Sequence, residues 1–414
     1  MNEYIFIASC VVFSFFTLEL IISKGVITPF SFLSFLYLSS ILGSFFLFAE
    51  FSVPYKEYSI TATIIFLLAF LIYMIPVSML NLRKVDDIYC ADDKAFFRIG
   101  WFLIVTNAFA IIYFIPIVYG VFSSADNIIN LRAMVVSQES VSSGGLYLLF
   151  SYTTQFYPIM LVFFFYSYLK HPEKKWFNIL MLLTSMSYIV NVLASVGRDG
   201  IVLWSMSFLF SYIIFKGFLD KEVRRRIKKY FLFLFLSFIS FFILISLARF
   251  LKGGDYFSLF QSMLIYFSQQ FGEFNRYATN IDANNMDFSK IFPILKYFKE
   301  TDSVSLLDDH FGFLNTYGFS KYVFKTFIGS WYTHLGSIGL LLTVTFISAL
   351  FSIFMYSFRT KTLSLGVVVV YTLYCQVILH GVFYYKLSYT VSNLYMLTVF
   401  LIFIFLHYRV FIKR

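Results

Sequence analysis

The sequence predicts an all-α polytopic membrane protein with about eleven transmembrane helices and one long extracytoplasmic loop between the eighth and the ninth. Three observations lead to this prediction: an apolar composition, a series of apolar runs as long as a bilayer is thick, and an uneven distribution of basic residues between the loops. We expect a single transmembrane domain over residues 1–414, in which 249–328 forms the loop and packs on the bundle.

The composition excludes an ordinary soluble protein. Of the 414 residues, 60% are hydrophobic and 13% are charged, whereas soluble domains are about 25% charged. So much apolar surface is hidden only by lipid. We therefore assign the net charge of +10 to orientation in the membrane and expect no nucleic-acid partner.

The apolar runs have the length of membrane helices. A helix needs about 20 mainly apolar residues to cross the hydrocarbon core, and backbone groups in lipid must pair within their own segment, which favours helices over strands. Runs of this kind lie near 4–22, 26–49, 59–80, 99–120, 145–168, 177–196, 200–218, 230–249, 329–356, 365–385 and 391–408.

The basic residues orient these runs. With the N-terminus outside, the cytoplasmic segments hold 20 of the 32 Lys and Arg residues, and the short outer loops hold four. Cytoplasmic loops carry such an excess in membrane proteins. The C-terminus is then cytoplasmic, and the loop 249–328 lies outside. Within this loop we predict an interfacial helix near 259–277, with Glu273 and Arg276 on its polar face.

Two arginines next to predicted helix ends are candidate anion-binding groups. Arg198 lies in a short outer turn, where its guanidinium could bind a phosphate through two hydrogen bonds or pair with Asp199. Arg249 ends the eighth helix shortly before Lys252 and Gly253-Gly254. Two cations beside flexible glycines suit a pyrophosphate, and an interfacial anchor is the alternative.

The loop and the helix ends contain further candidates. Glu273 and Arg276, three residues apart, could pair with each other, or Arg276 could contact an anion while Glu273 orients an acceptor hydroxyl. His310 in the loop is a candidate general base. His334 and His380, near outer helix ends, are candidate bases or packing residues. The outer loop contains no Asp-x-Asp pair typical of a metal site, so we predict no metal and no cofactor.

Two stretches carry a resemblance to a known family. The first is the turn 195–200, in which glycines flank Arg198. The second is 326–339, in which Trp331 and Tyr332 precede His334 and a Gly-x-x-Gly pair; an acidic residue is expected at the position of His334. With the predicted topology, these stretches resemble the bacterial oligosaccharide repeat-unit polymerases, the Wzy-type O-antigen and capsule polymerases.

The resemblance implies a glycosyltransferase in the bacterial cytoplasmic (inner) membrane. Such an enzyme polymerises undecaprenyl-pyrophosphate-linked repeat units into O-antigen or capsular polysaccharide on the outer face. The expected partners are the lipid-linked donor and acceptor, membrane lipid and, as a candidate, a chain-length regulator protein. The residues then expected to bind pyrophosphate or substrate are Arg198, Arg249, Arg276, Tyr332 and His334, and those expected in catalysis are Glu273 and His310.

Three other functions remain open from the sequence. A flippase or transporter of lipid-linked glycans would favour two repeated halves and polar residues deep in several helices. An O-antigen ligase shares the layout and differs in its acceptor. A membrane-bound O-acyltransferase would use His380 as base.

Overall fold

The computed structural model describes residues 2–50, 58–80, 82–123, 144–195, 197–250, 256–281, 286–298, 324–358 and 360–408. The chain divides into two compact units. Unit 1 comprises Met1–Asn81, Phe260–Arg359 and Tyr374–Leu394, and unit 2 comprises Leu82–Leu259, Thr360–Leu373 and Tyr395–Arg414.

The described residues are mostly helical. The helices and strands that lie wholly or mainly in unit 1 are α1 (Asn2–Ile22), α2 (Pro29–Glu50), α3 (Ile60–Met79), α12 (Tyr256–Asn280), η3 (Phe288–Lys290), η4 (Pro293–Phe298) and α14 (Thr326–Ser357). Those of unit 2 are η1 (Leu82–Lys84), β1 (Asp87–Tyr89), α4 (Asp93–Ser123), α6 (Gly145–Thr154), α7 (Tyr157–Lys170), α8 (Lys175–Ser185), α9 (Ser187–Ala194), α10 (Asp199–Phe215), α11 (Lys221–Phe250) and β2 (Thr362–Ser364). Two helices have residues in both units: α15 (Leu365–His380) and α16 (Thr390–His407).

The protein is an all-α membrane protein by the length and apolarity of its helices. Among the described residues, seven helical segments are long and apolar enough to cross a bilayer. They are Glu3–Ile22, Pro29–Leu47, Ile60–Met79, Asp93–Gly120, Lys175–Ala194, Thr326–Ser357 and Thr390–His407. An eighth span results if α6 and α7, which meet at a bend of 41°, are taken together. The expected continuous helix over 145–168 is therefore broken at this bend.

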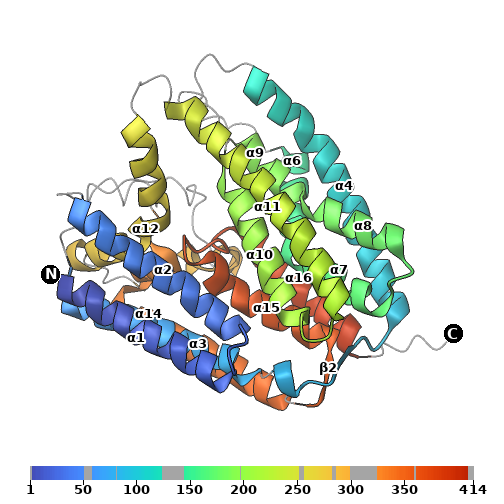
Figure 1. Ribbon diagram of the computed structural model, residues 1–414, viewed down its shortest axis with the longest axis horizontal. Coiled ribbons are helices and arrows are strands. Elements are labelled where there is room, and N and C mark those ends of the chain that lie inside the picture. Colours follow the sequence, from blue (N-terminus) through green and yellow to red (C-terminus); the bar gives the residue numbers. More distant parts are fainter. Residues whose placement is uncertain are drawn as a thin grey trace. The chain divides into compact units, whose positions relative to one another are not determined.

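Aromatic packing holds the helices of unit 1. Helix α3 runs alongside α14, and α1 packs on both α2 and α3 (Figure 1). The rings of Tyr73 and Tyr374 stack with centroids 4.5 Å apart, and the Tyr374 hydroxyl donates to the Tyr73 carbonyl at 2.7 Å. The Tyr37 hydroxyl donates to the carbonyl of Ile378 at 3.1 Å. Buried tyrosines thus supply both apolar area and the hydrogen bonds that their hydroxyls require.

Helix α12 docks on α2 through polar contacts. The Ser40 hydroxyl donates to Gln270 Oε1 at 3.0 Å, and the Ser44 hydroxyl donates to the Ser268 carbonyl at 2.7 Å. The helices approach so closely at Gly43 that a Cβ there would lie 2.3 Å from Ser268 Oγ and 3.1 Å from its Cα. Small residues at such crossings let two backbones come together.

Helix α12 also packs against α3 and the residue that precedes it. Asn275 Oδ1 accepts hydrogen bonds from the Ser59 amide at 3.3 Å and the Thr63 hydroxyl at 3.5 Å. The rings of Phe271 and Phe274 lie 5.0 and 5.3 Å from that of Phe66. Gln270 and Asn275 of α12 therefore face its neighbours α2 and α3.

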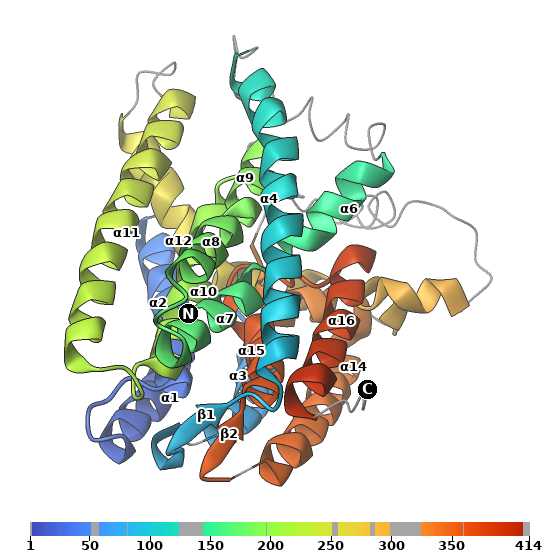
Figure 2. The same cartoon turned by 90° about the vertical axis from the view of Figure 1, so that its right-hand side faces the viewer.

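Unit 2 is built around α4. This helix packs on α6, α8 and α9, and β1 pairs with β2 in parallel (Figure 2). Polar residues inside its helices pair across helix boundaries: the Ser187 hydroxyl donates to Asn107 Oδ1 at 2.6 Å, and Asn191 Nδ2 donates to Thr154 Oγ1 at 2.9 Å. These polar groups within apolar helices therefore have a structural role.

We expect Gly43→Ala to lower the free energy of unfolding by about 1–3 kcal/mol, because the new methyl group must displace Ser268 and the backbone of α12. Thermal unfolding of the purified protein in detergent measures this loss. Gly120→Ala is the matched control in α4, since nothing lies within 4 Å of a Cβ built there. Equal stability of the two variants would contradict the close α2–α12 approach.

Candidate functional site

Unit 1 contains four of the predicted site residues, which lie on two helices. Glu273 and Arg276 lie on α12, and Tyr332 and His334 lie on α14. The Arg276 guanidinium lies 3.8 Å from Glu273 Oε2, with side chains 24% and 2% exposed. The Tyr332 hydroxyl donates to the Ala278 carbonyl at 3.2 Å. Tyr332 thus connects α14 to the last turn of α12, which is a positioning contact.

A residue outside the sequence-based candidates, Lys325, lies beside the same helices. The residue is only 6% exposed. The amine donates a hydrogen bond to Thr333 Oγ1 at 3.1 Å and lies 4.3 Å from the centre of the Tyr277 ring. We call Glu273, Arg276, Tyr277, Lys325 and Thr333 the Lys325 cluster.

A strained backbone directs Lys325 onto α14. Thr326 has a φ of 64°, a left-handed conformation that is rare for a β-branched residue and costs about 1–3 kcal/mol. Hydrogen bonds hold it there: the Thr326 amide donates to the Phe383 carbonyl at 3.0 Å, and the Phe327 amide to the Gly381 carbonyl at 2.7 Å. The chain therefore reverses at Thr326, so Lys325 reaches Thr333 on the second turn of α14.

A glycine makes room for the lysine stem. A Cβ at Gly329 would lie 3.1 Å from Lys325 Cβ and 3.4 Å from a ring carbon of Phe274. A second glycine, Gly336, adopts a φ of 66° and a ψ of −174°, which breaks the helical geometry inside α14. This region of conformational space is accessible to glycine almost alone. The two glycines shape the segment of α14 that carries Tyr332, Thr333 and His334.

Burial sets the electrostatics of the cluster. Burial lowers the pKa of Lys325 from 10.5 to about 7, and the nearby Glu273 carboxylate raises it in part. Desolvation disfavours the charged amine, and the carboxylate favours it. Near neutral pH this amine therefore exchanges a proton readily, as groups in ligand sites often do.

Arg198 belongs to unit 2, where it precedes α10. Packing accounts for the glycines beside it, since a Cβ at Gly197 or at Gly200 would lie 2.5 or 2.8 Å from the side chain of Val192. Arg198 as a whole residue is half-buried. The small-residue turn seen in the sequence is thus a consequence of the close packing of α9 and α10.

The side chains of two predicted site residues are outside the described part of the structure. Arg249 lies in the last turn of α11, and the placement of its side chain is outside the described residues. His310 lies outside them entirely. Their roles remain predictions.

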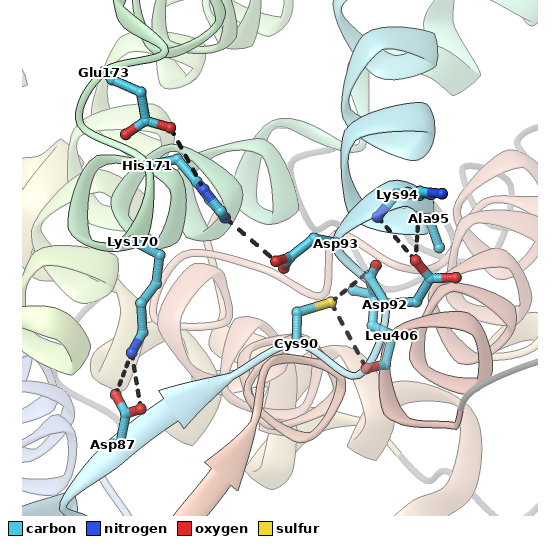
Figure 3. Close-up of polar contacts among 10 residues, drawn as sticks. All are labelled: Asp87, Cys90, Asp92, Asp93, Lys94, Ala95, Lys170, His171, Glu173 and Leu406. Atoms are coloured by element: carbon cyan, nitrogen blue, oxygen red, sulfur yellow. Dashed lines mark hydrogen bonds and ion pairs between the residues drawn. The ribbon is translucent and has the colours of Figure 1, made fainter.

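Unit 2 contains a second polar cluster, with structural functions. The Lys170 amine contacts both oxygens of Asp87 at 2.6 and 2.8 Å, which fastens β1 to the end of α7 (Figure 3). Asp92 Oδ1 caps α4 by accepting two backbone amides. His171 lies 3.8 Å from carboxylate oxygens of both Asp93 and Glu173. Among the described residues, no group of three His, Cys, Asp or Glu residues could hold a metal ion.

The sequence contains a partial signal for Lys325. It directly precedes the apolar run of α14, at the end of the long loop, where a basic residue is normally taken for an anchor in the lipid headgroups. Its burial depends on Tyr277 and on the turn at 381–384, which are distant in the chain. No local pattern reports such contacts.

We expect competitive labelling of Lys325 with a small amine-selective reagent to follow an apparent pKa of about 7. Glu273→Gln removes the negative charge that raises this pKa, so the midpoint moves to lower pH. Peptide mass spectrometry reads the extent of labelling at each pH. Glu222→Gln, an exposed carboxylate on α11, is the control and leaves the midpoint unchanged. A midpoint near that of a solvated lysine would refute the burial of the amine.

No protein-family model, curated protein or solved structure matches this chain.

Proposed function

We propose that this protein is a glycosyltransferase that polymerises undecaprenyl-pyrophosphate-linked oligosaccharide repeat units on the outer face of the cytoplasmic membrane. The observation that supports it most is the Lys325 cluster, which combines two basic side chains, a carboxylate and the aromatic ring of Tyr277. A lipid-linked sugar diphosphate offers the complementary chemistry: a concentrated negative charge beside sugar rings.

The residues have distinct roles in this proposal. Arg276 and Lys325 bind the diphosphate of the donor and stabilise the charge that grows as it departs. Glu273 accepts the proton of the acceptor hydroxyl as its oxygen bonds to the anomeric carbon. The bond between that carbon and the phosphate oxygen breaks, and the diphosphate leaves with the electron pair. The step therefore needs no redox partner.

We further propose the finer topology: eleven transmembrane helices, an outside N-terminus, and the segment 249–328 on the outer side. The basic start of α11 supports this orientation, because Lys221, Arg224, Arg225, Arg226, Lys228 and Lys229 fall within its first three turns. Such clusters lie on the cytoplasmic side of membrane helices. The Lys325 cluster then lies on the opposite side, where lipid-linked glycans are polymerised.

We expect Arg276→Ala to reduce polymer formation by about 100-fold or more, as loss of a group that stabilises transition-state charge does. The assay incubates purified protein in nanodiscs with radiolabelled lipid-linked repeat units and resolves the products by chain length. Arg198→Ala tests the second proposed arginine in the same way, and both variants insert into the membrane normally. Arg226→Ala, an exposed arginine of α11, serves as control. Full-length polymer from Arg276→Ala would exclude this arginine from the mechanism, and translocation of substrate without chain growth would favour a flippase.

The topology gives a separate expectation for single-cysteine variants made after Cys10, Cys90 and Cys375 are replaced by serine. Lys290→Cys should react with a membrane-impermeant maleimide in intact spheroplasts. Arg225→Cys should react only after permeabilisation. The reverse pattern would place the Lys325 cluster on the cytoplasmic side and remove the proposed polymerase.

A further inference from the structure

We propose that Lys325 couples ligand binding in this cluster to a proton: when a diphosphate diester binds, one proton passes from solvent to Lys325 Nζ. The ligand class rests on the proposed function. The coupling itself rests on the charge balance and geometry around Lys325.

Lys325 is buried, so its positive charge when protonated needs a negative partner. The Glu273 carboxylate, which raises the pKa of Lys325, lies 3.8 Å from Arg276. The direct contacts of the Lys325 amine are neutral groups, the Thr333 hydroxyl and the Tyr277 ring. Among the described residues, no carboxylate oxygen lies within 4.0 Å of the amine. A bound anion that contacts the protonated amine compensates this buried charge.

The backbone fixes the amine in this place. The reversal at Thr326 and the space at Gly329 lead the lysine stem back across the first turns of α14. Arg276 lies on the facing helix, next to Tyr277, over whose ring the amine lies. The amine is thus held from a fixed backbone over the ring of Tyr277 on α12.

The proton balance follows from the electrostatics. With its pKa lowered to about 7 by burial, the free amine is about nine-tenths neutral at pH 8. Two negative charges nearby raise that pKa, and the amine then takes a proton from the buffer. No covalent bond forms or breaks. Above pH 7, affinity for the anion therefore falls by about tenfold per pH unit.

Isothermal titration calorimetry of the full-length protein in nanodiscs measures this uptake. The probe is P1,P2-dimethyl diphosphate, whose two esterified ends leave no group that titrates near pH 7. Titrations at pH 8 in two buffers with different ionisation enthalpies give the number of protons taken up. We expect about 0.9 protons per bound diester and a tenfold loss of affinity between pH 8 and pH 9.

Variants at Lys325 separate charge from proton transfer. Lys325→Met weakens binding and takes up no proton. Lys325→Arg keeps a permanent charge, so it binds the diester without uptake. Lys290→Met, a lysine of η3 in the same unit, keeps both properties of the wild type. Glu273→Gln lowers the pKa of Lys325 further, and uptake at pH 7 then rises above the wild-type value of about 0.5.

Three results would overturn the inference. One is uptake that persists in Lys325→Met; another is wild-type affinity that does not change between pH 8 and pH 9. The third is equal binding and uptake with dimethyl phosphate, the linkage of a phospholipid headgroup, which would make the site a lipid-headgroup site. If the Lys325 variants do not fold, the pH dependence of wild-type affinity and the proton uptake of Glu273→Gln still test the coupling. Polymer formation without uptake would refute only the coupling, and uptake without polymer formation only the proposed polymerase.

Discussion

Helix pairing in this protein depends on buried polar side chains, because its apolar surface is similar outside and inside. Phe6 and Ile21 are 66% and 75% exposed on α1, whereas Phe66 and Phe70 of α3 are almost completely buried. Lipid accepts both arrangements, so burial of such residues selects no particular neighbour. A misplaced polar group, in contrast, leaves a hydrogen bond unmade in an apolar medium. Contacts such as that between Ser40 and Gln270 therefore specify which helices meet.

This constraint explains why the polar side of α12 is buried. Gln270 and Asn275 face α2 and α3, where hydroxyl and amide groups receive them, and Glu273 is held by Arg276 on its own helix. A helix on the membrane surface would have turned the same residues to water. The packing that fixes α12 thus also places a carboxylate near Lys325, with Arg276 3.8 Å from that carboxylate. Structure and candidate chemistry here depend on the same contacts.

Local patterns in the sequence predict most of the helices and little of the site. Each apolar run contains a helix, since length and apolarity are local properties. The break between α6 and α7, the non-helical Gly336 and the reversal at Thr326 depend on tertiary contacts. Glu273 and Arg276 could be predicted as neighbours from their spacing. Lys325 could not be placed, because Tyr277 and the turn at 381–384 are far from it in sequence.

The glycine-flanked arginine and the buried lysine support function to different degrees. Gly197 and Gly200 are accounted for by the proximity of Val192, so the turn around Arg198 would form with or without a ligand. Packing alone does not explain why position 325 is occupied by a lysine. A methionine has a similar stem and would fill the same space without the several kcal/mol that a buried charge costs. The amine in this position is held by a strained residue over an aromatic ring. This placement instead fits a site in which a bound anion supplies the negative charge that balances the amine.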